Sequence, residues 1–187
     1  LTSVSTSYTG NMALHGNGGA VYVTTRATLS STSDTMAYNE VSTVGGNGGA
    51  LFVEEGGAVR TDTTTFKYHS VSMHGGSIYL KSGANIRMND SMLFESSAVR
   101  GGALYVEGTT TSVLIESSTF RHNNASLDGG LVHVSDGASV SVYQSTIRRH
   151  SASRFGGSIY MESGAFVNCS ENNISYSSAR DGGVFYL

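Results

Sequence analysis

The stretch Gly101-Gly102-Ala103-Leu104-Tyr105-Val106 decides the fold, because versions of it recur along the whole chain. A Gly-Gly pair opens at Gly18, Gly48, Gly75, Gly101, Gly129, Gly156 and Gly182. The spacing between successive pairs is 26 to 30 residues. Self-similarity at such a period is typical of proteins built from stacked structural repeats.

The residues after each Gly-Gly pair alternate in character with a period of two, which indicates a β-strand with two different faces. One face carries Val21, Leu51, Ile78, Leu104, Val132, Ile159 and Phe185, which we expect to point inward. A second apolar column in each repeat holds Leu29, Val59, Ile86, Val113, Val140 and Val167. A third holds Met36, Phe66, Leu93, Phe120, Ile147 and Ile174. The pattern therefore predicts three short strands per repeat and no helix.

These columns predict an all-β chain folded as a right-handed, single-stranded parallel β-helix of about 27 residues per coil. Right-handedness follows from the strong preference of parallel crossover connections. Residues 1–187 then form one segment of about six to seven coils, with the glycines at a corner. Because open coil ends expose core side chains, we expect flanking coils of the same, longer chain to continue the stack.

The composition limits the function classes. Charged residues make up 13% of the chain, the net charge is −3, and the eleven Lys and Arg residues form no cluster in the sequence. We therefore expect no nucleic-acid partner. No apolar run approaches the roughly 20 residues that a membrane-spanning helix needs, so we expect no membrane insertion by this segment. The single cysteine, Cys169, excludes an internal disulfide, and its inward column favours a buried structural thiol.

The repeat columns resemble a known family. Gly101-Gly102-Ala103-Leu104 and Phe120-Arg121-His122-Asn123 are similar to the GGA[IVL] and FxxN repeats of chlamydial polymorphic membrane proteins. That resemblance implies a surface-exposed, adhesin-type β-helix. The Asn of FxxN recurs at Asn39 and Asn123, whereas the same column elsewhere holds His69, Ser96, His150 and Ser177.

The strongest candidate for partner binding is the outward column of the first strand. It comprises Tyr22, Phe52, Tyr79, Tyr105, His133, Tyr160 and Tyr186. An exposed row of rings can stack on sugars or anchor a protein partner. The alternative is a self-stacking ladder that sets the register of the coils and supports a neighbouring loop. On the exposed interpretation, Leu104→Asp should unfold the stack, whereas Tyr105→Ser should leave folding largely intact.

Few residues suggest catalysis. Glu54, Lys81, Glu107 and Glu162 share a column just after the first strand, where a carboxylate pair could serve glycoside hydrolysis. The alternating charges favour a solvated charge ladder instead. The six histidines form no pair with metal-ligand spacing, so we expect no metal site and no cofactor.

Together these observations predict a non-enzymatic, extracellular structural or adhesive β-helix module, which could also assemble into a cell-surface appendage. Its expected partners are other protein subunits or cell-surface glycans. Four Asn-x-Ser sequons, at Asn89, Asn124, Asn168 and Asn173, are candidate glycosylation sites. The alternative function is a carbohydrate-active β-helix, similar to pectin lyases in fold, whose catalytic residues lie outside this segment.

Overall fold

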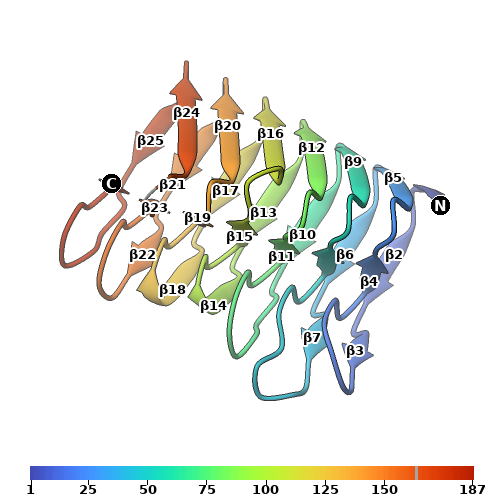
Figure 1. The fold of residues 1–187 in the computed structure, drawn as a ribbon. Helices are drawn as coiled ribbons and strands as arrows, with labels where there is room; N and C mark the ends of the chain where they lie inside the picture. Colours follow the sequence, from blue (N-terminus) through green and yellow to red (C-terminus); the bar gives the residue numbers. More distant parts are fainter. Residues whose placement is uncertain (163) are drawn as a thin grey trace.

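The computed structural model describes residues 1–162 and 164–187, and none of these residues lies in a helix. The chain winds into a parallel β-solenoid whose coils stack along one axis, with the termini at opposite ends (Figure 1). Three sheets of seven strands each run the length of the stack. The all-β parallel solenoid predicted from the repeat columns is confirmed.

Each sheet contains one strand from each successive coil. We number the sheets 1, 2 and 3 in the order in which their strands follow a Gly-Gly pair along the chain. Sheet 1 contains β4 (Val21–Val23), β8 (Leu51–Val53), β11 (Ile78–Leu80), β15 (Leu104–Glu107), β19 (Val132–Ser135), β23 (Ile159–Met161) and β26 (Phe185–Tyr186). Sheet 2 contains β1 (Thr2–Val4), β5 (Thr28–Thr32), β9 (Ala58–Asp62), β12 (Asn85–Asn89), β16 (Ser112–Glu116), β20 (Ser139–Tyr143) and β24 (Phe166–Ser170). Sheet 3 contains β2 (Ser7–Thr9), β6 (Thr35–Ala37), β10 (Thr65–Lys67), β13 (Met92–Phe94), β17 (Thr119–Arg121), β21 (Thr146–Arg148) and β25 (Asn173–Ser175).

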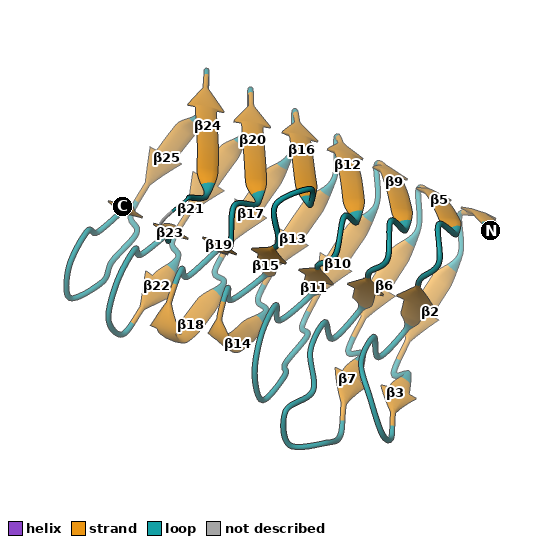
Figure 2. Cartoon of the chain, viewed as in Figure 1, coloured by secondary structure: helices purple, strands orange, loops and turns teal. Residues whose placement is uncertain are grey.

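Several coils carry a fourth, short strand that the apolar pattern did not predict. These strands are β3 (Met12–Ala13), β7 (Glu40–Val41), β14 (Ser97–Arg100), β18 (Asn124–Asp128) and β22 (Ser151–Ala152). They lie between sheet 3 and the loop that returns to the next Gly-Gly pair (Figure 2). Small residues such as Val41, Val71 and Ala98 form a separate apolar cluster beneath this loop.

The Gly-Gly pair combines two requirements, which Gly101 and Gly102 illustrate. Gly101 has φ +61°, a left-handed conformation that side chains rarely adopt. Gly102 has an ordinary φ, but a Cβ there would collide with the carbonyl oxygen of Gly130 in the next coil. The first glycine therefore makes the corner, and the second allows successive coils to approach each other at the spacing of a β-sheet.

The core fills the interior of the coils. Each strand pairs in register with its equivalent one coil away, as in Leu104 with Val132 and Phe120 with Ile147. These side chains are fully buried together with Phe66, Leu93 and Ile115. Since a buried aliphatic or aromatic side chain contributes about 1.5–3 kcal/mol, the stack is stabilised mainly by contacts between neighbouring coils.

Candidate functional site

The rings of the outward column of sheet 1 form one continuous stack. They point away from the core, as predicted, and successive ring centres from Tyr22 to Tyr186 lie 4.7–5.5 Å apart. The planes of Tyr79 and Tyr105 differ by only 3°. This offset stacking follows directly from the in-register pairing of the strands.

Of the two interpretations of this row, an exposed surface and a self-stacking ladder that supports a loop, burial in the middle of the stack favours the ladder. Phe52, Tyr79, Tyr105 and His133 are 1%, 6%, 8% and 0% exposed, and only the two end members, Tyr22 and Tyr186, are well exposed. Tyr160 is half-buried. The loops that precede the Gly-Gly pairs provide further rings against the row. The row is therefore a buried ladder that supports these loops.

Two loop residues show how the row is covered. His74 stacks on Tyr105 with 4.4 Å between ring centres, and Phe155 stacks on Tyr186 at 4.3 Å. Tyr105 is 8% exposed and stacks on Tyr79, His133 and His74, so we expect Tyr105→Ser to destabilise the fold.

The carboxylates just after sheet 1 hold the hydroxyl groups of the tyrosine row. Tyr79 donates a hydrogen bond of 2.5 Å to Glu107, and Tyr22 donates one to Glu54. The bond to Glu54 is the largest of the effects that raise the pKa of Tyr22 to about 12. Burial alone would raise the pKa of Glu54, but hydrogen bonds from Tyr22 and Lys81 outweigh it and hold that pKa below its ordinary value. A carboxyl group held ionised in this way is poorly suited to be a general acid.

His133 replaces a tyrosine in the middle of the row. Its Nε2 lies 3.3 Å from Oε1 of Glu162, without the geometry of a hydrogen bond. Neither ring nitrogen has a hydrogen-bond partner among the described residues. Burial between Tyr105 and Tyr160 lowers the pKa of His133 to about 3, so the ring is neutral at physiological pH.

A buried polar ladder explains the variation in the Asn column of the repeat. Oδ1 of Asn123 accepts a hydrogen bond of 2.9 Å from the backbone N–H of Ser96, one coil earlier. In the next coil Nδ1 of His150 accepts an equivalent bond of 3.1 Å from the N–H of Asn123. Asn39 and His69 repeat the arrangement, with a 3.1 Å bond from the Asn39 N–H to Nδ1 of His69. Asn and neutral His therefore do the same work here: each places an acceptor where the corner leaves an N–H unpaired.

Where serine occupies the Asn column, its hydroxyl group contacts a second serine of the same coil. In the coil that contains Ser96, the residue after the Gly-Gly pair is Ser77, and the two hydroxyl oxygens lie 2.7 Å apart. The same substitution pair recurs as Ser158 and Ser177, also at 2.7 Å. A shorter side chain at the corner is thus compensated by a hydroxyl group across the coil.

An ion pair with a buried carboxylate lies at the end of the fourth strand, next to the loop. Asp128 is 1% exposed, and both of its carboxylate oxygens accept hydrogen bonds from Arg154, from Nε at 2.8 Å and from Nη2 at 2.5 Å. Arg100 approaches the same carboxylate at 3.7 Å. This network ties three consecutive coils together and is structural in character.

The sequons differ in accessibility. Asn124 and Asn173 are exposed, whereas Asn89 and Asn168 are half-buried. Nδ2 of Asn89 donates to Asp62 at 3.0 Å, and Nδ2 of Asn168 donates to the hydroxyl of Tyr143 at 2.7 Å. Cys169 lies in its predicted inward column but is only half-buried, and burial raises its pKa.

The outer side of sheet 3 is the exposed ring-bearing surface that sequence reasoning missed. Lys67, Phe94, Arg121 and Arg148 are paired in register along one column. The next residue of each coil forms a parallel corner column. We call this surface the basic–aromatic face, and it comprises Tyr38, Lys67, Tyr68, Phe94, Glu95, Arg121, His122, Arg148, Arg149 and Tyr176. An alignment of the residues that follow the inward Phe and Ile of the third strand would have revealed this surface.

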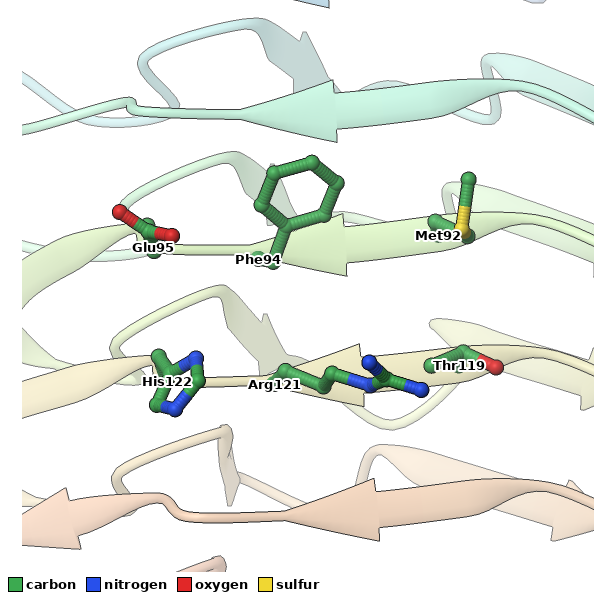
Figure 3. Close-up of a pocket in the computed structure, with 6 residues that line it drawn as sticks. All are labelled: Met92, Phe94, Glu95, Thr119, Arg121 and His122. Carbon is green, nitrogen blue, oxygen red and sulfur yellow. The ribbon is translucent and has the colours of Figure 1, made fainter.

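Part of the basic–aromatic face is hollowed. A depression of about 340 Å³ is lined by Met92, Phe94, Glu95, Thr119, Arg121 and His122. These side chains come from β13 and β17 and from the residue that follows each strand, and equivalent positions of the two coils lie side by side (Figure 3). A smaller hollow of about 90 Å³ continues from Arg121 and His122 to Arg148 and Arg149. The two hollows together cross three coils.

The described residues include no cluster of three or more His, Cys, Asp or Glu side chains that could hold a metal ion. Within residues 1–162 and 164–187 there is also no helix with the length and apolarity to cross a bilayer. No protein-family model, curated protein or solved structure shows significant similarity to the chain. The geometry of the solenoid and its surfaces is therefore the basis for any functional conclusion.

Proposed function

We propose that the chain is a non-enzymatic, extracellular β-helix module with a structural and adhesive role. The observation that carries the proposal is the way the coils are tied together. A ring stack, a polar ladder at the corners and the backbone sheets all run along the same axis. Such redundancy favours a stiff rod that presents its sides to partners over a body that opens and closes around a substrate.

Three further observations support this role. The abundance of Ser, Thr and Gly suits many short strands joined by tight turns, an arrangement that gives long flat faces. Asn124 and Asn173 present sequons in exposed positions. Two of the three carboxylates in the column considered for catalysis are engaged, since Glu54 binds Tyr22 and Lys81, and Glu107 binds Tyr79. Partner subunits and cell-surface glycans remain the proposed ligands.

One assay distinguishes the proposed function from the alternative, a carbohydrate-active β-helix. The purified chain is incubated with isolated cell walls and a panel of polysaccharides, and both retained protein and released reducing ends are measured. Retention without release of products is the expected result. Release of soluble sugars above a heat-denatured control would overturn the non-enzymatic proposal.

Localisation needs its own measurement. Intact source cells are labelled with a membrane-impermeant amine reagent, and the chain should be labelled to the same extent before and after lysis. Labelling only after lysis would contradict the extracellular assignment.

A further inference from the structure

The charge on the basic–aromatic face is one-sided. Lys67, Arg121, Arg148 and Arg149 lie on it, and Glu95 is the one acidic residue of its two described columns. None of these four cations forms an ion pair with a described carboxylate, whereas Arg60 and Arg87 on sheet 2 are paired with Asp62 and Glu116. Four unpaired cations on one face of a chain with net charge −3 form a local site for anions.

The corner column of this face bears bulky side chains at a conformational cost. Its members have φ between 54° and 60°, in the left-handed region, and are Tyr38, Tyr68, Glu95, His122, Arg149 and Tyr176. Such a conformation costs about 1–2 kcal/mol for a residue other than glycine.

The opposite corner, between sheets 2 and 3, provides the comparison. It uses the same conformation but holds small or polar residues: Ser5, Ser33, Thr63, Asp90, Ser117, Gln144 and Glu171. The first coil has Gly10 at the position equivalent to Tyr38, so the fold itself accepts glycine there. The rings and cations of the basic–aromatic face are therefore not needed for the turn, and their side chains are available for a ligand.

Rings and cations on this face are arranged to act together. Tyr38 and Tyr68 stack at 4.8 Å, and the Nζ of Lys67 lies 5.7 Å from the ring centre of Tyr68. At the other end, the guanidinium of Arg148 lies 5.6 Å from the ring centre of Tyr176. Tyr68 and Tyr176 thus each combine an apolar ring with a neighbouring cation that can donate hydrogen bonds.

We propose that the basic–aromatic face binds an acidic polysaccharide lying across successive coils, with carboxylate or sulfate groups on the cations and sugar rings on the aromatic side chains. This inference rests on the proposed adhesive function and names the class of glycan. Arginine suits such a ligand because its planar donors pair with carboxylate and sulfate oxygens. The hollow of about 340 Å³ between Phe94 and Arg121 is the centre of the site.

Other occupants fit the face less well. The inner strands of sheet 3 are hydrogen-bonded on both sides, so a peptide cannot add to them as a further strand. Four of the six residues that line the hollow, Glu95, Thr119, Arg121 and His122, carry polar or charged groups, which the apolar face of a helix would leave without partners. A flat row of rings, hydroxyl groups and cations matches an extended, polar, negatively charged chain.

The test is affinity electrophoresis and calorimetry with four probes: alginate for carboxylates, dextran sulfate for sulfates, neutral dextran, and single-stranded DNA for a nucleic acid. The unmodified chain should bind one or both acidic probes, more weakly as salt rises, and should not bind dextran. Arg149→Gly and Arg121→Gln should each weaken that binding about tenfold, the scale of one charge-assisted hydrogen bond.

Arg26→Gly is the matched control. Arg26 is an exposed arginine with φ 58°, so its replacement makes the same chemical and conformational change at a different corner. Binding should then change by less than about twofold, the scale of a charge that makes no contact. Far-ultraviolet circular dichroism and thermal melting confirm that each variant is folded, and Arg121→Gln serves if Arg149→Gly does not fold.

The outcomes separate the two proposals. Equal binding by Arg149→Gly, Arg121→Gln and the unmodified chain would overturn the proposed site, as would failure to bind either acidic probe. Tighter binding of single-stranded DNA than of either probe would replace the glycan with a nucleic acid. Retention on cell walls without any dependence on these arginines would leave the adhesive function standing while this site fails. Release of sugars from alginate would instead contradict the non-enzymatic function.

Discussion

The buried histidines of the polar ladder make the stability of the solenoid depend on pH. His69 and His150 are each 1% exposed, and burial lowers their pKa from 6.5 to about 4 and about 3. Above pH 6.5 both the folded and the unfolded chain hold these rings neutral, so their effect on stability is absent. As pH falls below 6.5, the unfolded chain binds protons that the folded chain does not, and the free energy of unfolding decreases.

The magnitude follows from the two pKa values. Each histidine removes stability at up to about 1.4 kcal/mol per pH unit below 6.5, until its folded pKa is reached. Between pH 7 and pH 5, His69 and His150 should therefore each cost about 2 kcal/mol. Carboxylates also titrate toward pH 5, so the change in the unmodified chain alone would not identify the histidines.

The repeat itself supplies the comparison variant. Asn occupies the equivalent position at Asn39 and Asn123 and accepts the same backbone hydrogen bond. In the double variant His69→Asn/His150→Asn the ladder should persist, while both titrations are removed. Urea denaturation at pH 7 and pH 5, followed by circular dichroism, measures the free energy of unfolding of both proteins.

We expect the double variant to lose about 4 kcal/mol less than the unmodified chain between pH 7 and pH 5. Identical losses in the two proteins would refute the reasoning, because they would mean that these rings are protonated in the folded state. A variant that is much less stable already at pH 7 would show that Asn cannot replace His in this ladder.

Three further predictions concern packing. Gly102→Ala should lower the free energy of unfolding by about 3 kcal/mol or more because a Cβ collides with the next coil. Gly10→Ala, with open space around it, should lower it by only about 1–2 kcal/mol. Urea denaturation compares the two variants, and equal losses would contradict the argument that the coils approach closely at Gly102. Tyr105→Ser should cost about 3 kcal/mol, as expected for a buried aromatic, and an unchanged melting temperature would show that the loops do not cover the row. Ser77→Ala and Ser96→Ala should be coupled by about 0.5–1.5 kcal/mol in a double-mutant cycle, and strict additivity would mean that their hydroxyl groups do not interact.

Much of the fold could be predicted because its determinants are local and repeat. The position of Leu104 after its Gly-Gly pair and the alternation around it predict an inward side chain without knowledge of any contact, and the residue is fully buried. The Phe120 and Ile147 anchors align in sheet 3 as their spacing indicated. The short fourth strands were missed because residues such as Ser151 and Ala152 carry too little apolar pattern to distinguish a strand from a loop.

The candidate site was predicted less well, because the exposure of an outward side chain depends on whether a loop packs over it. Strand alternation correctly placed Tyr79 and Tyr105 outside the core, but it cannot indicate that His74 folds back onto them. In sequence, His69 departs from the Asn of the repeat. In the structure its Nδ1 accepts a hydrogen bond from the Asn39 N–H, which is the role that Asn has at this position in other coils.

The period, the parallel stacking and the inward columns can be predicted from the repeats alone, since each depends on one coil and its immediate copy. Which outward surface is available depends on how the folded chain packs its loops. Loops cover the middle of the ring row of sheet 1. On the outer side of sheet 3, Tyr38, Arg121, Arg149 and Tyr176 are exposed, and Tyr68, Phe94 and Arg148 are half-buried. The physical reason is that Phe94, Arg121 and Arg148 are 27 residues apart along the chain and become one surface only when the coils stack in register.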